Sequence, residues 1–272
     1  MPRFKLTIEY AGTRYSGWQI QQNANTVQGE IDRAVRTVTG RQDFELYGSG
    51  RTDAGVHALG QVAHLDVSTD LSPDALVERL NGELPDDINI LAAEQVPHRF
   101  HARHHATARR YLYQIARRRT AADLAYVWWV KEPLDVNRMR EAARAFVGMR
   151  DFRSFAVSTA RDADEAPPST RVLVDQIEIV ENGDLILITV QGSHFLWKMV
   201  RRMVGVLVEI GRGAMPPEAI RTMLTEGSPA PARLTAPPSG LFLENVDYEP
   251  VSARSTGTPL RRTPRTRRTT SS

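Results

Sequence analysis

The pattern of apolar and polar residues in the first third of the chain predicts alternating strands and helices. Residues 4–10 alternate apolar and polar side chains, which is the period of a half-buried strand. Apolar residues from Val27 to Val38 recur at helical spacing, with Asn25 or Thr26 available as the N-cap. Further strands are predicted at 44–47, 60–67 and 88–96, and a second helix at 73–84. The resulting order, β-α-β-β-α-β, is the split βαβ unit of ferredoxin-like folds.

The rest of the chain repeats this order. Strands are predicted at 107–116, 171–180, 185–191 and 241–246, and helices at 136–147 and 195–210. Asn182-Gly183 is a strong turn signal, and Pro216-Pro217 is expected to open a further short helix. We therefore predict an α+β fold of two ferredoxin-like (βαββαβ) halves that share a mostly antiparallel central sheet. Helices are expected on one face of this sheet and a cleft on the other.

The expected divisions are an N-terminal α/β half at 1–105, a C-terminal α/β half at 106–250 and a tail at 251–272. The tail holds six arginines and no acid, although the whole chain has a net charge of only +3. The body is therefore slightly acidic, and any RNA-binding surface on it must come from local clusters of Arg and Lys. The tail composition predicts a basic disordered extension, and polar residues 158–169 predict a loop.

Composition restricts the chemistry and the compartment. The 272 residues include no cysteine, which excludes disulfides, thiol catalysis and thiolate metal sites, and which fits a cytoplasmic enzyme. No stretch approaches the roughly 18 apolar residues that span a bilayer. The N-terminus also lacks the apolar core of a signal peptide. We expect a cytoplasmic protein with no membrane partner.

A glycine-rich loop at 48–61 is the strongest candidate for chemistry. It carries Arg51 and Asp53 between glycines, which suit tight backbone and close approach to a ligand. In an extended segment, residues two apart point the same way, so Arg51 and Asp53 are expected to form a pair. A neighbouring cation favours the ionised carboxylate even in a dry pocket, and covalent or charge-stabilising catalysis needs such a group. Taken alone, the same pattern also fits a structural turn with a salt bridge.

The segment Gly50-Arg51-Thr52-Asp53-Ala54-Gly55-Val56-His57 resembles the signature of the tRNA pseudouridine synthase A (TruA) family. Further blocks of the family pattern follow in order at 9–19, 81–88, 100–103, 106–113, 151–155, 199–205 and 240–243. Together the blocks extend from about residue 4 to residue 248. Several blocks in one order are far more specific than any single motif. Trp197-Lys198 departs from the residue pairs expected in many family members at this place.

The resemblance implies the pseudouridine synthase fold and an isomerase that converts uridine to pseudouridine in the anticodon stem-loop of tRNA, at positions 38, 39 and 40. The N-glycosidic bond is cut, the uracil turns, and C5 is joined to the ribose. No redox step occurs, so neither a cofactor nor a metal is expected. The resemblance also implies a homodimer, as in family members that hold tRNA across two subunits.

The resemblance assigns roles to four residues. The catalytic aspartate falls on Asp53, which attacks the sugar, attacks the base or abstracts a sugar proton. The substrate-binding tyrosine falls on Tyr111, whose ring can stack on a flipped base and whose phenol can serve as an acid or a base. Arg51 and Arg201 are the further substrate-binding candidates. Arg201 lies in the apolar stripe of the helix at 195–210, from which it can snorkel to the surface or reach a carboxylate or a phosphate.

Other functions are compatible with parts of the sequence. Four histidines at 98, 101, 104 and 105 suggest a metal site, but solvated or RNA-facing histidines fit better because no metal-binding carboxylate motif accompanies them. His57 has no serine or cysteine nucleophile in a triad pattern, so we expect it to stabilise the loop. Lys198 and Arg202 are interpreted as phosphate contacts or plain surface. A non-catalytic RNA-binding module is the alternative class, although the aromatic sheet motif of such modules is missing.

Overall fold

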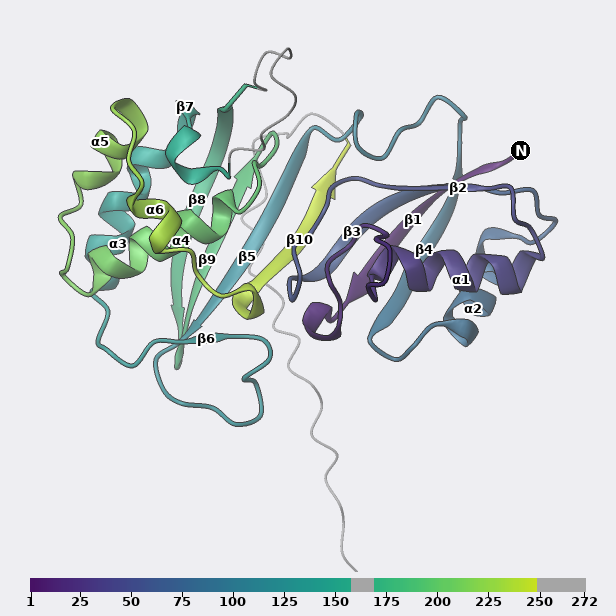
Figure 1. Ribbon diagram of the computed structural model, residues 1–272, viewed down its shortest axis with the longest axis horizontal. Coiled ribbons are helices and arrows are strands. Elements are labelled where there is room, and N and C mark those ends of the chain that lie inside the picture. Colours follow the sequence, from purple (N-terminus) through teal and green to yellow (C-terminus); the bar gives the residue numbers. More distant parts are fainter. Residues whose placement is uncertain (158–168, 249–272) are drawn as a thin grey trace, which may run out of the picture.

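A single twisted sheet extends through the whole molecule (Figure 1). In the computed structural model, residues 1–157 and 169–248 are described, and the basic tail and most of the polar loop predicted at 158–169 lie outside them. The strands are β1 (Arg3–Tyr10), β2 (Glu45–Gly48), β3 (His57–Asp66), β4 (Ile88–Val96), β5 (Ala108–Ala116), β6 (Trp128–Trp129), β7 (Gly148–Asp151), β8 (Arg171–Asn182), β9 (Leu185–Gly192) and β10 (Leu241–Asp247). The α-helices are α1 (Val27–Thr39), α2 (Pro73–Glu83), α3 (Val136–Ala143), α4 (Met199–Gly211), α5 (Ala219–Thr225) and α6 (Ala230–Arg233). Short 3-10 turns lie at Gly12–Arg14, Arg144–Phe146, Arg153–Phe155 and Pro238–Gly240.

The strand order is the same in both halves. In the first half the order across the sheet is β4, β1, β3 and β2, and in the second half it is β10, β5, β9 and β8. In each of these sets of four strands the first strand along the chain therefore lies between the last strand and the third. Pairing is antiparallel except between β3 and β10 and between β5 and β6. The α+β fold with a mostly antiparallel central sheet, predicted from the sequence, is therefore confirmed.

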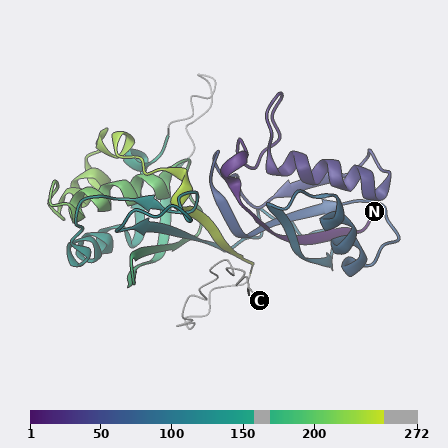
Figure 2. The same cartoon turned by 90° about the horizontal axis from the view of Figure 1, so that it is seen from below.

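The two halves meet where β10 lies between β3 and β5 (Figures 1 and 2). One edge of β3 is shared by two partners. The β2 strand pairs antiparallel with the end of β3 around Ala63, and β10 pairs parallel with its beginning, where Phe242 is opposite His57. The loop that leaves β2 at Gly48 therefore emerges at the junction of the halves.

Each half buries its own helices against the same face of the sheet. Leu6 and Ile8 of β1 are fully buried in a core with α1 and α2, and Tyr113 of β5 is buried in a core with α3 and α4. On β10, Leu243 belongs to the first core and Leu241 to the second. Residues two apart on a strand share a face, so both groups of helices cover the same side of the sheet.

Local signals explain most of the element boundaries. The Thr26 hydroxyl accepts a hydrogen bond from Gly29 N at the start of α1, and Ser72 caps α2 in the same way through Ala75 N. The helix predicted at 136–147 ends earlier, because the chain tightens into a 3-10 turn before Gly148, whose φ of +94° begins β7. Among the described residues, no helix is long and apolar enough to cross a membrane.

The helix predicted at 195–210 begins only at Met199, so that prediction is wrong for its first turn. Lys198 has a φ of +62°, a left-handed conformation that an α-helix does not contain. The apolar residues at 195 and 196 do pack against the core, which is why the periodicity continued through them. They do so from a loop rather than from a helical turn.

Candidate active site

The loop after β2 ends in a tight turn that presents Asp53. The amide of Val56 donates to the Asp53 carbonyl at 3.1 Å, and Gly55 has a φ of +76° at the third position of this turn. A positive φ at this position is the mark of a type II turn, which explains the glycine. The Asp53 side chain is 22% exposed and points into a cleft.

Residues 10–19 form a cradle under this loop. The amide of Trp18 donates to the carbonyl of Thr52 at 3.1 Å, and the hydroxyls of Tyr10 and Thr52 are 2.8 Å apart. A Cβ on Gly12 would lie 1.9 Å from the Val56 carbonyl oxygen, and a Cβ on Gly17 would lie 2.5 Å from that of Thr52. The two most distinctive sequence segments of the first half are therefore one structure, and its glycines permit close backbone contact.

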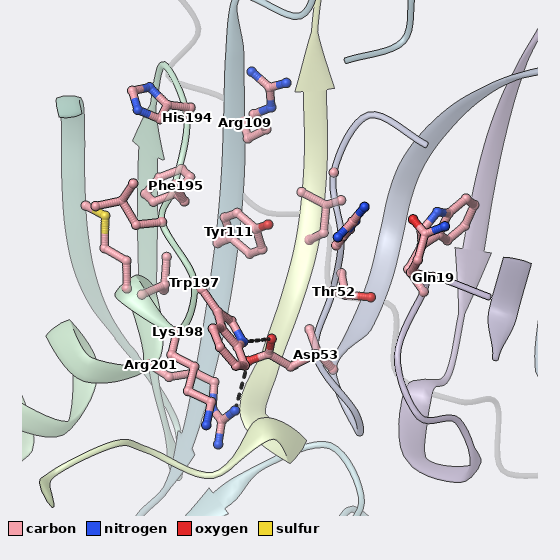
Figure 3. A pocket seen from close by; sticks show the side chains of 18 of the residues that line it. Gln19, Thr52, Asp53, Arg109, Tyr111, His194, Phe195, Trp197, Lys198 and Arg201 are labelled. Carbon is pink, nitrogen blue, oxygen red and sulfur yellow. Dashed lines mark hydrogen bonds and ion pairs between the residues drawn. The ribbon is translucent and has the colours of Figure 1, made fainter. Parts of the chain in front are cut away.

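The Asp53 carboxylate has two donors from the other half of the chain (Figure 3). Its Oδ1 accepts from the Trp197 indole Nε1 at 2.9 Å, and its Oδ2 accepts from an Arg201 terminal nitrogen at 3.0 Å. Arg201 is 13% exposed, and its Nε donates to the Ala236 carbonyl at 2.7 Å, which fixes the direction of the guanidinium. The ion pair joins residues 148 positions apart across the junction of the halves.

The expected Arg51–Asp53 pair does not form, although the cation required beside Asp53 is present as Arg201. Arg51 is exposed on the cleft wall and makes no hydrogen bond or ion pair with any described residue. The Asp53 carboxylate is bound instead by Trp197 and Arg201, which the fold brings from the other half of the chain. No acid among the described residues therefore neutralises Arg51 on the cleft wall.

The loop before α4 supplies both Trp197 and the wall behind Tyr111. Phe195 packs edge-on against the Tyr111 ring with centroids 5.1 Å apart, and Trp197 is directed at Asp53. Lys198 follows in the left-handed conformation, which costs about 1–2 kcal/mol for a residue with a Cβ. This strained residue lies between the loop that carries Trp197 and the helix that carries Arg201. Its conformation therefore sets the directions of both donors to Asp53.

Tyr111 stands on β5 at the floor of the cleft, half-buried and next to both cores. Burial raises the pKa of its phenol to about 12; the nearby Arg109 opposes this shift and Asp53 adds to it. The phenol is therefore protonated throughout the neutral range and serves as a stacking ring or a hydrogen-bond donor. Tyr113 lies on the same face of β5. Its side chain is buried in the second core, and its hydroxyl donates to the Pro237 carbonyl.

Arg109 is a residue of the site that the sequence interpretation did not single out. Its guanidinium donates to the carbonyls of Ser193, Arg103 and Ser49 at 2.8, 2.9 and 3.2 Å, and burial lowers its pKa. It thus ties the start of the Asp53 loop to the second half. Its place two residues before Tyr111 on one strand was the available signal, since the two side chains share a face.

These residues line a cleft of about 1160 Å³ at the junction of the halves. Its described lining contains one acid, Asp53, and six cations: Arg51, Arg103, Arg109, Arg153, Lys198 and Arg201. A concave wall with this imbalance attracts polyanions such as nucleic acid. The cleft lies between the two groups of helices on the helical face, not on the opposite face as predicted, because Tyr111 points to the same side as the buried Tyr113.

The remaining candidates are structural or lie outside the cleft. His57 Nδ1 accepts from Gly12 N at 3.1 Å and its Nε2 lies 3.0 Å from the Ala125 carbonyl, so the neutral ring braces the loop as expected. Arg202 is buried and donates to the Ala156 carbonyl, so the phosphate or surface role proposed for it is wrong. The rings of His101 and His104 pack 4.2 Å apart, and no group of metal-binding side chains occurs in the described residues.

Comparison with known proteins gives consistent results. A family model described as tRNA pseudouridine synthase matches residues 6–105 and 142–249. Proteins named tRNA pseudouridine synthase A are similar to this chain: that of Nitrobacter hamburgensis is 43% identical (91% of this chain, 100% of that protein), that of Nitrobacter winogradskyi 42% (92% and 96%), and that of an Exiguobacterium species 40% (92% and 100%). A solved Cbf5-Nop10-Gar1 complex is similar over 75% of this chain and 45% of its own, with 10% identity and a TM-score of 0.32, a likeness too slight to carry an argument.

Proposed function

Since this chain belongs to the tRNA pseudouridine synthase family, we propose that it isomerises uridines 38, 39 and 40 of the tRNA anticodon stem-loop with Asp53 as its catalytic group. Conversion of uridine to pseudouridine in tRNA follows from the family. The choice of uridines and the residue roles are our proposal. The observation that carries it is the placement of Asp53, held by Trp197 and Arg201 in the acid-poor cleft.

The chemistry defines what Asp53 has to do. The bond from N1 to the ribose C1′ breaks, a bond from C5 to C1′ forms, C5 loses a proton and N1 gains one. The atoms balance without an oxidant or a reductant. Attack on the sugar, attack on the base and removal of a sugar proton all require a carboxylate oxygen aimed at the nucleotide. The Oδ1 atom of Asp53, on the side of Trp197, is the oxygen that we assign to this task.

Tyr111 and the cations complete the proposed site. A uridine in a stem reaches Asp53 only after it has flipped out, at a cost of a few kcal/mol. The Tyr111 ring at the cleft floor can return on the order of 1–3 kcal/mol by stacking on the flipped base. Arg51, which no described residue neutralises, is proposed to contact a phosphate beside the flipped nucleotide. Arg201 acts through Asp53 by holding its carboxylate in one orientation.

The test is to map pseudouridine by carbodiimide probing on unmodified tRNA after incubation with the wild type, Asp53→Asn and Asp53→Ala. We expect modification at 38, 39 and 40 by the wild type and none by either variant. Both variants should still bind tRNA, because phosphate contacts dominate affinity. Asp184→Asn, an exposed change on the β8–β9 hairpin, is the matched control and should react normally. Normal turnover by Asp53→Asn would refute the catalytic role, and modification at other uridines would refute the proposed positions.

We also propose that the enzyme works as a homodimer in the cytoplasm, where two subunits hold one tRNA. The support is the resemblance to family members that bind tRNA in this way. Sedimentation equilibrium at the concentration used for the activity assay is the measurement. The mass of a dimer is expected, and the mass of a monomer in active samples would contradict the proposal.

A further inference from the structure

Trp197 has a position that the proposed chemistry does not require. Its indole N–H is bound to Asp53 Oδ1 at 2.9 Å, while Oδ2 is bound to Arg201. The indole lies inside the cleft beside the carboxylate (Figure 3). A nucleotide that approaches Oδ1 from the cleft therefore meets the Trp197 ring. Each carboxylate oxygen can accept a second hydrogen bond, so the obstacle to the nucleotide is the bulk of the indole beside Oδ1 and not the hydrogen bond alone.

The two donors are anchored very differently. The Arg201 side chain is 13% exposed and is tied to the Ala236 carbonyl by a second hydrogen bond. Trp197 is 50% exposed and belongs to neither hydrophobic core, although its neighbours Phe195 and Leu196 pack against one. Besides its bond to Asp53, the ring interacts with the ammonium of Lys198, which lies 5.3 Å from the ring centroid. Trp197 is therefore the donor that can leave.

The backbone around Trp197 is fixed, so the movement is one of the side chain. The Trp197 carbonyl accepts from Val157 N at 3.2 Å, and the Lys198 carbonyl accepts from Arg202 N at 3.0 Å. Rotation of the indole about its side-chain bonds leaves these contacts intact. A displaced indole also has its face available, and an aromatic ring in a nucleic-acid cleft stacks on bases of any sequence.

We propose that Trp197 is a latch on Asp53. In the RNA-free protein its N–H holds Oδ1, and when RNA occupies the cleft the side chain turns away, frees this oxygen and stacks on an RNA base. The lost hydrogen bond is thereby exchanged for a stacking contact. The functional meaning of the latch rests on the catalytic role proposed for Asp53. Trp197 is a positioning residue for Asp53 in the RNA-free protein, and it is a binding residue once its ring stacks on the RNA.

A binding cycle tests the latch without turnover. The Kd for unmodified tRNA is measured for the wild type, Trp197→Phe, Asp53→Ala and the double variant. Phenylalanine keeps a ring and removes the N–H. Without the competing hydrogen bond, Trp197→Phe should bind tRNA at least about fivefold more tightly than the wild type. In the Asp53→Ala background the same substitution should give no tightening, because the bond is already absent.

Trp129→Phe is the matched control. This tryptophan is 37% exposed on β6 and does not line the cleft, so its substitution should leave the Kd unchanged in both backgrounds. An equal effect of Trp197→Phe with and without Asp53 would overturn the latch. Fluorescence gives a second readout: the emission that the wild type has and Trp197→Phe lacks should change when tRNA is added, and a constant emission would also overturn it. Turnover of Asp53→Asn tests the catalytic role separately, so the two proposals can fail independently.

Discussion

Replacement of Arg201 tests how far the Asp53 carboxylate depends on its partner across the junction. The guanidinium serves two acceptors at once, the Ala236 carbonyl at 2.7 Å and Asp53 Oδ2 at 3.0 Å. Alanine removes both contacts and the charge. Lysine keeps the charge but presents a single ammonium, which cannot reproduce the fixed fork of an arginine. The two variants therefore separate charge from orientation.

The structure sets the size of the effect. A hydrogen bond to a charged group contributes about 1.5–3 kcal/mol, and the exposures of 13% and 22% leave this pair only weakly screened by water. We expect Arg201→Ala to cost about 2–4 kcal/mol of transition-state stabilisation, which is a loss of about 30- to 900-fold in the rate of the chemical step. Arg201→Lys should lose about 5- to 30-fold, because one of two contacts remains.

The assay is the single-turnover rate of pseudouridine formation with enzyme in excess over tRNA, which separates chemistry from binding. Arg212→Ala is the control, since Arg212 pairs with Glu132 and Glu209 outside the cleft and its loss should leave the rate unchanged. Thermal melts establish that each variant is folded. A folded Arg201→Ala protein with a rate within about threefold of the wild type would refute the role given to this ion pair.

Three further predictions follow from the site and the fold. Tyr111→Ala should weaken tRNA binding by about 5- to 150-fold through lost stacking, whereas Tyr111→Phe should not. Because the pKa of this phenol is raised to about 12, the reaction rate should show no ionisation of Tyr111 between about pH 6 and 10. An ionisation step that is present in the wild type and absent in Tyr111→Phe would contradict this. Gly17→Ala should lower the Tm more than Gly213→Ala, because both glycines have a positive φ but an added Cβ meets backbone atoms only at Gly17. An equal decrease in Tm would contradict the close packing of residues 10–19 against the Asp53 loop. Burial lowers the pKa of His64 to about 4, and its neutral Nδ1 accepts a hydrogen bond from Ala102 N. The free energy of unfolding in urea should therefore be highest above about pH 6.5 and fall towards pH 4, and it should fall less steeply in His64→Gln. The same pH dependence in the wild type and His64→Gln would refute this.

The fold was largely predictable because its elements carry local signals. The N-cap at Thr26 and the proline that follows Ser72 mark helix starts, and strict alternation marks β1. The start of α4 was mispredicted for an identifiable reason. Phe195 and Leu196 are apolar and pack, partly buried, against the core, so the helical period extended over them. No pattern of side-chain polarity reveals the left-handed backbone of Lys198.

The site was predictable in its position but not in its contacts. The glycine-rich segment and the family blocks predicted Asp53 and Tyr111 as site residues, and the structure places both with Arg201 in one cleft. Sequence distance favoured Arg51 as the partner of Asp53, whereas the fold supplies Arg201 from 148 positions away. Such a contact depends on how β10 joins the halves, and residue spacing contains no information on that step. The Trp197 contact could not be expected either, because the predicted helix would have given its side chain another direction.

The position of β10 has a consequence for the making of the protein. A ribosome releases the first half, with α1 and α2, long before residues 241–247 exist, so the core around these helices still lacks Leu243 and Val246 of β10. Until then β3 lacks the neighbour that pairs with it at His57, and β5 lacks the partner opposite Tyr111. Before this last strand is inserted, the sheet does not join the half that carries Asp53 to the half that carries Arg201. A chain that ends before β10 would thus have two incomplete cores and two halves that the sheet does not join, so that incomplete products of translation would not modify the tRNA that translation uses.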